Sequence, residues 1–142
     1  MSDYDLYYWS VPFRGQFVRA VLAYAGKTWT ERGDGAISKL MNGPVKQMPV
    51  PFMGPPLLID KKADFAIAEM PAIVLYLGET LDLMPATPAL RAMTMKIVND
   101  ANDVIDERGG RICLNTVSLS ISGSSAGLVR SMPVSGPCAR RA

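Results

Sequence analysis

The first thirty residues alternate between short apolar runs and one segment with helical spacing. Residues 4–9 are rich in aromatic side chains and end before Ser10-Val11-Pro12, which predicts a buried strand. Between residues 13 and 25 the apolar positions form one stripe of a helix, and Gly26 follows where a C-terminal cap glycine belongs. Residues 28–31 alternate again. This order predicts a β-α-β unit with a parallel strand pair and a right-handed crossover.

The next part of the chain predicts a loop region followed by a hairpin. Residues 33–56 hold five prolines and four glycines, so we expect at most a short helix there, near residues 37–41. Two short apolar runs, 57–60 and 65–68, flank the polar residues 61–64. Such a pair of runs around a polar turn predicts a β-hairpin.

Two helices are predicted after the hairpin. Pro71 lies near the start of the first, which runs to about Leu77, because proline is tolerated in the first turn of a helix. Thr87-Pro88 is a good pair for the cap and first position of the second, which ends near Glu107. The apolar face of that second helix comprises Leu90, Met93, Ile97, Ala101 and Val104.

Composition places most of the chain among ordinary soluble domains. Of its 142 residues 49% are hydrophobic and 20% charged, and no apolar run is long enough for a transmembrane helix. The first residues lack the basic and apolar regions of a secretory signal. Residues 1–107 carry ten Lys and Arg against thirteen Asp and Glu, which does not favour nucleic-acid binding. We therefore expect a cytoplasmic protein with no nucleic-acid and no membrane partner.

The character of the chain changes after Glu107. Residues 108–142 carry five Arg and no acidic residue, and they contain seven Ser and both Cys. This low-complexity composition predicts a disordered, solvated tail. The abrupt change favours the hypothesis of a truncated, spliced or out-of-frame C-terminus.

The absence of histidine removes several kinds of chemistry. Ser-His-Asp and Cys-His nucleophile systems and imidazole-based zinc sites are excluded. Two cysteines provide neither a metal cluster nor a disulfide framework. Neither cysteine lies in residues 1–107, which disfavours thiol-disulfide chemistry there. We expect no metal.

The order β-α-β, irregular segment, β-β-α is that of a thioredoxin-like α/β domain. Within it, the run Pro55-Pro56-Leu57-Leu58-Ile59-Asp60, followed by residues 67–73 and Tyr76-Leu77, resembles the third strand and third helix of glutathione S-transferases. Residues 6–26 align without gaps with the first strand and helix of their tyrosine-type members. The resemblance implies a glutathione-binding domain at 1–80, a linker at 81–87 and the first helix of a truncated all-helical domain at 88–107.

The resemblance also implies a site for the backbone of glutathione. Pro56 is the cis residue, and Pro55 pairs with the cysteinyl part of the ligand, as in β-augmentation. Pro55 accepts a hydrogen bond through its carbonyl but has no N–H to donate. Glu69 matches the acidic position that meets the ligand's ammonium, although it equally suits the dipole of a helix start. Met70 replaces the family's serine, so only its backbone N–H remains for the γ-glutamyl carboxylate.

Two hydroxyl groups compete to stabilise the glutathione thiolate. The gapless alignment puts Tyr8 at the catalytic tyrosine, although a buried-strand aromatic is also a good interpretation. Alternatively, Ser10-Val11-Pro12-Phe13-Arg14 resembles the motif of serine-type members, and Ser10 lies at the strand-to-helix turn where such sites form, which favours it slightly. The same resemblance assigns Phe13 to the glutathione site. It also assigns to it a lysine for the glycyl carboxylate, Lys46 or else Lys39.

The resemblance implies a glutathione transferase-like protein. With glutathione as co-substrate, its thiolate is conjugated to electrophilic small molecules, as in detoxification. The shortened helical domain removes much of the second-substrate pocket, so activity of this chain stays open. The alternative is a non-catalytic thioredoxin-fold binding module, which fits the departures at Pro55 and Met70. Family members commonly dimerise, and an uncovered apolar helix favours a homodimer.

Overall fold

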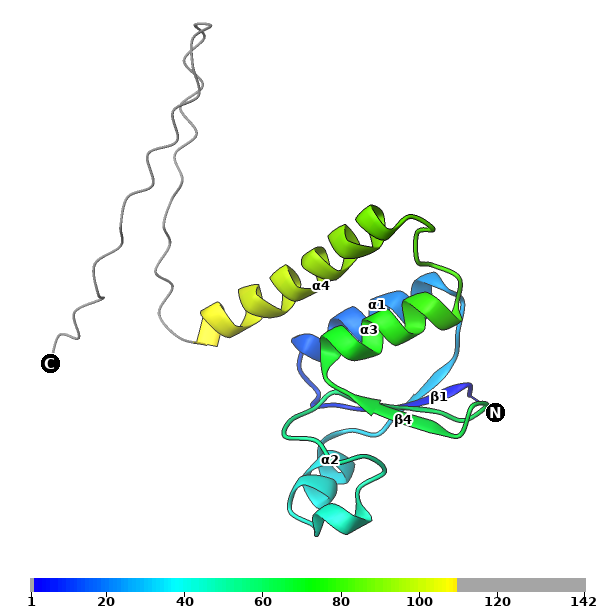
Figure 1. Ribbon diagram of the computed structural model, residues 1–142. Coiled ribbons are helices and arrows are strands. Elements are labelled where there is room, and N and C mark those ends of the chain that lie inside the picture. The colour runs from blue at the N-terminus through cyan, green and yellow to red at the C-terminus, as the bar shows by residue number, and fades with distance from the viewer. Residues whose placement is uncertain (1, 110–142) are drawn as a thin grey trace, which may run out of the picture. The chain divides into compact units, whose positions relative to one another are not determined.

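A four-stranded mixed sheet lies at the centre of the structure, a computed structural model that describes residues 2–109 (Figure 1). The sequence predicts a tail over residues 108–142; residues 108 and 109 are the last of a helix, and residues 110–142 lie outside the described residues. The strands are β1 (Tyr4–Tyr7), β2 (Trp29–Glu31), β3 (Leu57–Asp60) and β4 (Phe65–Ala68), in the order β2-β1-β3-β4. β2 runs parallel to β1, and the other pairs are antiparallel.

Helices cover both faces of this sheet. α1 (Arg14–Tyr24) and α3 (Met70–Thr80) pack together on one face, and α2 (Asp34–Met41) lies on the other (Figure 1). A 3₁₀ helix, η1 (Val45–Gln47), follows α2. The predicted thioredoxin-like fold class is confirmed: a β-α-β unit, a segment with a short helix, and a hairpin followed by a helix.

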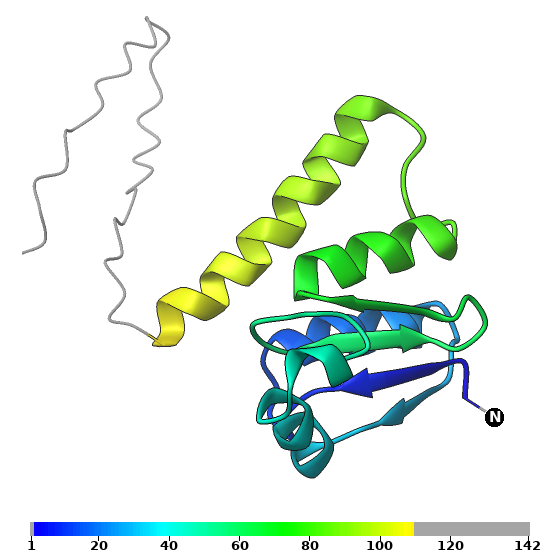
Figure 2. The same cartoon turned by 60° about the horizontal axis from the view of Figure 1, so that its bottom comes forward.

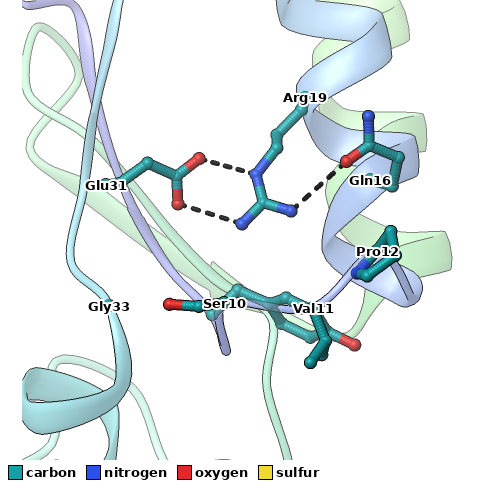
Figure 3. A pocket seen from close by; sticks show the side chains of 8 residues that line it. Ser10, Val11, Pro12, Gln16, Arg19, Glu31 and Gly33 are labelled. Carbon is teal, nitrogen blue, oxygen red and sulfur yellow. Dashed lines mark hydrogen bonds and ion pairs between the residues drawn. The ribbon is translucent and has the colours of Figure 1, made fainter.

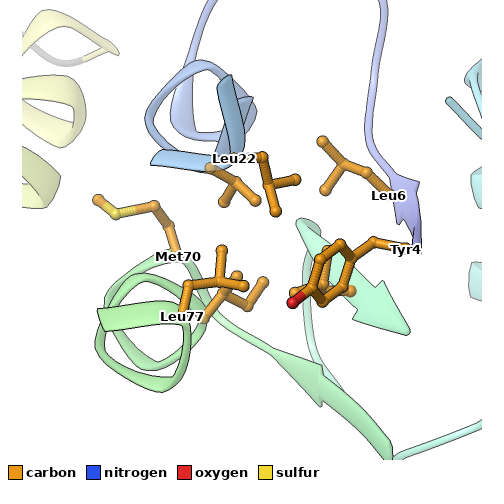
Figure 4. Packing of buried hydrophobic residues seen from close by; sticks show 8 residues of the cluster. Tyr4, Leu6, Leu22, Met70 and Leu77 are labelled. Atoms are coloured by element: carbon orange, nitrogen blue, oxygen red, sulfur yellow. The ribbon is translucent and has the colours of Figure 1, made fainter. Parts of the chain in front are cut away.

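The core lies between the sheet and the pair α1 and α3. Alternation along β1 turns Tyr4 and Leu6 toward the helices, where they meet Leu22 of α1 and Leu77 of α3 (Figure 4). The predicted glycine cap of α1 is also present, since Gly26 has a φ of 64°, in the left-handed region that glycine adopts readily. The apolar stripe predicted between residues 13 and 25 is also the face of α1 that packs on the core, through Leu22.

β1 is shorter than the aromatic run predicted. It ends at Tyr7, which pairs with Leu57, the first residue of β3. Two prolines precede Leu57 and have no N–H to extend the ladder. Tyr8 therefore leaves the sheet.

The long helix α4 (Pro88–Gly109) lies beside α3 in both views (Figure 1 and Figure 2). The Thr87 cap is present, with the N–H of Leu90 donating to Thr87 Oγ1 at 3.4 Å. Val98 packs against the core, and Arg14 of α1 donates to Asn102 Oδ1 at 2.9 Å. None of the helices within residues 2–109 is long and apolar enough to cross a membrane.

Candidate functional site

Three segments of the chain meet at one end of the sheet. The register pairs Leu57 of β3 with Tyr7 of β1 and with Ala68 of β4, so β1 and β4 end where β3 begins. Just beyond this row, the backbone N–H of Glu69 donates to the carbonyl of Pro56 at 3.2 Å. Strand order thus brings the end of β1 to the segments that open β3 and α3.

The peptide bond between Pro55 and Pro56 is cis, as the resemblance implies. Pro56 is fully buried and Pro55 is half-buried. The carbonyl of Pro56 is engaged by Glu69. The group that Pro55 offers a peptide ligand is its carbonyl, since a proline nitrogen has no hydrogen.

The start of α3 presents backbone rather than side-chain groups. Glu69 occupies the N-cap position of α3, and its exposed side chain makes no capping hydrogen bond. Its φ of 72° is an uncommon conformation for a residue with a side chain. The Met70 side chain is 1% exposed and belongs to the hydrophobic core (Figure 4). An anion at this helix start therefore meets backbone N–H groups and the helix dipole.

An open hollow of about 390 Å³ lies beside the end of β1 (Figure 3). The strand-to-helix turn, α1 and β2 all contribute to it. Its lining residues are Tyr8, Ser10, Val11, Pro12, Gln16, Arg19, Glu31 and Gly33. Both hydroxyl residues proposed from the sequence thus line the same hollow.

The two hydroxyl residues are held in different ways. Tyr8 is 4% exposed, and its ring lies against the backbone of α1 at Gly15. The guanidinium carbon of Arg19 lies 5.8 Å from the centre of that ring, within the range of a cation–π contact. Ser10 is exposed, and its backbone N–H donates to Asp34 Oδ1 at 2.7 Å.

Arg19 is fixed by a carboxylate across the hollow. Its Nε and Nη2 donate to the two oxygens of Glu31 at 2.6 and 3.1 Å (Figure 3), and the indole N–H of Trp29 donates to Glu31 at 2.9 Å. The hydrogen bond with Arg19 holds the pKa of Glu31 below its usual value, and Glu31 in turn raises the pKa of Arg19. The pair therefore stays ionised near neutral pH and orients the guanidinium over Tyr8.

The remaining predicted residues lie around these groups. Phe13 immediately precedes α1 and is 48% exposed, and Lys46 is exposed on η1. Lys39 of α2 lines a second hollow of about 280 Å³ together with Tyr7 and Gln47. Of the two lysines, Lys39 thus lies at a hollow beside β1.

Sequence reasoning missed the partners that hold the hydroxyl residues. Asp34 lies at the start of the Pro/Gly-rich stretch 33–56, and its link to the turn at Ser10 has no local signal. Gly15 looked like one more helix residue. Arg19 did carry a signal, since it lies off the apolar stripe of α1 and one helical turn after Gly15.

The strand order, the helices on both faces and the proline opening β3 define a thioredoxin-like domain, extended here by α4. A search against models of protein families finds no match, and no curated protein matches either. Solved structures do match: a Nu-class glutathione S-transferase from Haemonchus contortus has a TM-score of 0.57 and 20% identity over 75% of this chain.

Two further structures give the same picture. The glutathione S-transferase from Ascaris lumbricoides matches with a TM-score of 0.55 and 24% identity over 74% of this chain, and prostaglandin synthase D of Nilaparvata lugens with 0.56 and 18% over 75%. The chain spans about half the length of these proteins, between 48% and 50%. The chain therefore has the glutathione S-transferase fold over that half.

Proposed function

We propose that the chain binds glutathione at the end of the sheet where β1 ends and α3 begins. The convergence of three kinds of group there carries the proposal. Two hydroxyl residues offer donors to a thiol, the Pro55 carbonyl offers an acceptor to a peptide N–H, and the start of α3 offers backbone N–H groups to a carboxylate. These three kinds of group match the thiol, the peptide N–H and the carboxylate of the tripeptide.

The proposed reaction is conjugation of the glutathione sulfur to an electrophilic small molecule. The thiol releases its proton to solvent, and a hydroxyl of Tyr8 or Ser10 donates a hydrogen bond to the thiolate, which lowers the thiol pKa. The sulfur then forms a bond to an electrophilic carbon. The electrons of the bond that breaks leave with the displaced group or, in an addition, take up a proton from solvent.

Calorimetric titration of glutathione into the purified chain at neutral pH tests the binding step. We expect a Kd in the millimolar range or tighter. Glu69→Ala should weaken binding by roughly two- to fivefold, because an exposed carboxylate contributes little to a charge pair in water. Asp103→Ala, which removes another exposed carboxylate, on α4, is the matched control and should leave Kd unchanged.

The absence of binding heat from a chain shown to be folded by circular dichroism would contradict the proposal. Equal losses in Glu69→Ala and Asp103→Ala would indicate a general charge effect instead of a contact at α3.

A non-catalytic binding module is the second candidate, and two observations favour it. The Met70 side chain lies in the core, so it offers the ligand no hydroxyl such as a serine would offer. Pro55 has no N–H, so it cannot donate the hydrogen bond that a non-proline residue could donate there. Such a module is retained on immobilised glutathione or on a protein partner without turning over electrophiles. Turnover that Tyr8→Phe or Ser10→Ala abolishes, with retention preserved, would assign the enzyme instead.

The proposal includes a cytoplasmic location and a homodimer. A reaction of this kind needs reduced glutathione, and thiols are kept reduced in the cytosol.

Four apolar residues on one face of α4 are more than half exposed, which favours the proposed homodimer: Leu90, Met93, Ile97 and Val104.

A further inference from the structure

Gly15 is buried, and the ring of Tyr8 occupies the space that a side chain at position 15 would need. It is the second residue of α1, and a Cβ built on it would lie 2.6 Å from Cγ and 2.9 Å from Cε1 of the Tyr8 ring, with Cδ1 closer still. These separations are far below a carbon–carbon contact distance. Tyr8 can therefore keep its place only while residue 15 has no side chain.

A second residue of α1, Arg19, also contacts the Tyr8 ring. Arg19 lies one turn further along the helix, and its guanidinium sits 5.8 Å from the ring centre, anchored by Glu31. The Tyr8 ring is thus held by backbone at one point and by a fixed cation at another. Glycine disfavours the helix more than any other residue except proline. Here the packing of the Tyr8 ring against the helix backbone offsets that cost.

Ser10 has no comparable support. It is exposed on the turn between β1 and α1, and the hydrogen bond with Asp34 fixes its backbone N–H, not its hydroxyl. A group that stabilises a developing charge works best when a rigid element holds it in place. Of the two candidates, Tyr8 meets this requirement.

We propose that Gly15 is a positioning residue that seats the Tyr8 ring on α1, so that Tyr8, not Ser10, provides the hydroxyl that meets the thiol. This inference rests on the proposed glutathione reaction. It adds a second, separable statement about packing, which can be measured without glutathione.

The packing statement is tested by fluorine NMR of protein labelled with 3-fluorotyrosine. Tyr8→Phe identifies the Tyr8 resonance by its loss. Gly15→Ala should shift that resonance, whereas Gly35→Ala, where an added Cβ meets nothing within 4 Å, should not. An unmoved Tyr8 resonance in folded Gly15→Ala would overturn the proposal.

Stability provides a test that survives if Gly15→Ala folds poorly. Overpacking should lower the Tm of Gly15→Ala by about 5–15 °C. In a Tyr8→Ala background the ring is gone, so the same substitution should leave the Tm unchanged or raise it, since alanine favours a helix. An equal loss of Tm in both backgrounds would contradict a seat for Tyr8.

Turnover of glutathione with an aryl halide tests the catalytic statement. Gly15→Ala should lower kcat on the order of 10²-fold while the KM for glutathione changes little, because a small misplacement of the donor affects the thiolate most. Normal kcat with a shifted Tyr8 resonance would assign the role to Ser10. If wild-type protein neither binds nor turns over glutathione, the proposed function fails, and the two packing measurements alone decide on the seat.

Discussion

Asp60 illustrates how one side chain can join a turn, a strand and a helix. One of its oxygens accepts the backbone N–H groups of Lys62 and Ala63, both at 3.0 Å, which fixes the hairpin turn. The other accepts the hydroxyl of Tyr76 at 2.9 Å. The carboxylate is buried and satisfied from both sides, so it ties β3 to α3.

Tyr76→Phe should destabilise the fold by about 1–2 kcal/mol, because it removes a hydrogen bond to a charged group and keeps the ring packing. That ring lies 5.0 Å from the ring of Phe65. Urea unfolding at pH 8 measures the change. Tyr24→Phe is the matched control and should have no effect, since Tyr24 is 83% exposed.

The same pair predicts a pH dependence at alkaline pH. Burial, together with the hydrogen bond to Asp60, raises the pKa of Tyr76 to about 12. An unfolded tyrosine ionises near pH 10, so between pH 10 and 12 the unfolded chain loses a proton that the folded chain keeps, and stability falls. The advantage of wild type over Tyr76→Phe should be complete below pH 10 and disappear toward pH 12. An advantage that stays constant across this range would contradict the bond.

At the scale of elements, α4 presents an apolar stripe away from the face by which it packs. Ile97 is 60% exposed, whereas its neighbour Val98 packs against the core. The packed side of α4 is partly polar, with Arg91 paired to Glu79 and Asn102 to Arg14. The pattern of apolar positions therefore predicts the stripe correctly but not which side meets the domain.

Lysine at these two neighbouring positions should have opposite effects. Val98→Lys should cost about 1–3 kcal/mol, because it forces a charge into the contact with the core. Ile97→Lys should leave the urea midpoint unchanged and reduce any concentration-dependent association. Sedimentation velocity and urea unfolding of both variants check this. Comparable destabilisation by the two would place Ile97 in an intramolecular contact.

The elements were predictable where local pattern decides them. The hairpin, the glycine after α1 and the cap at Thr87 all follow from short-range rules. The end of β1 was not, because it depends on where β3 can begin pairing, a contact fifty residues away in the sequence. Non-local pairing of this kind leaves no mark in the run 4–9 itself.

The candidate site was predictable only in part for the same reason. The resemblance singled out Pro55-Pro56 and Glu69, and the structure joins them through a backbone hydrogen bond. It could not show that the side chain of Met70 enters the core, since burial depends on how α3 sits on the sheet. Nor could it show that Tyr8 rests on Gly15, a contact between a strand end and a helix.

On the scale of the whole molecule, the chain spans about half of the transferases it matches. The described part contains the sheet, the helices on both faces and one further helix. The groups of the proposed glutathione site all lie within this part. The proposed binding of glutathione can therefore be tested on this chain before any reaction.

Chemical-shift mapping of ¹⁵N-labelled protein during a glutathione titration tests that step directly. The amides of Tyr8, Ser10, Glu69 and Met70 should shift together with one dissociation constant. Those of the hairpin turn 61–64, at the opposite end of β3, should not move. Shifts confined to the hairpin, or none at millimolar glutathione, would contradict a glutathione site at this end of the sheet.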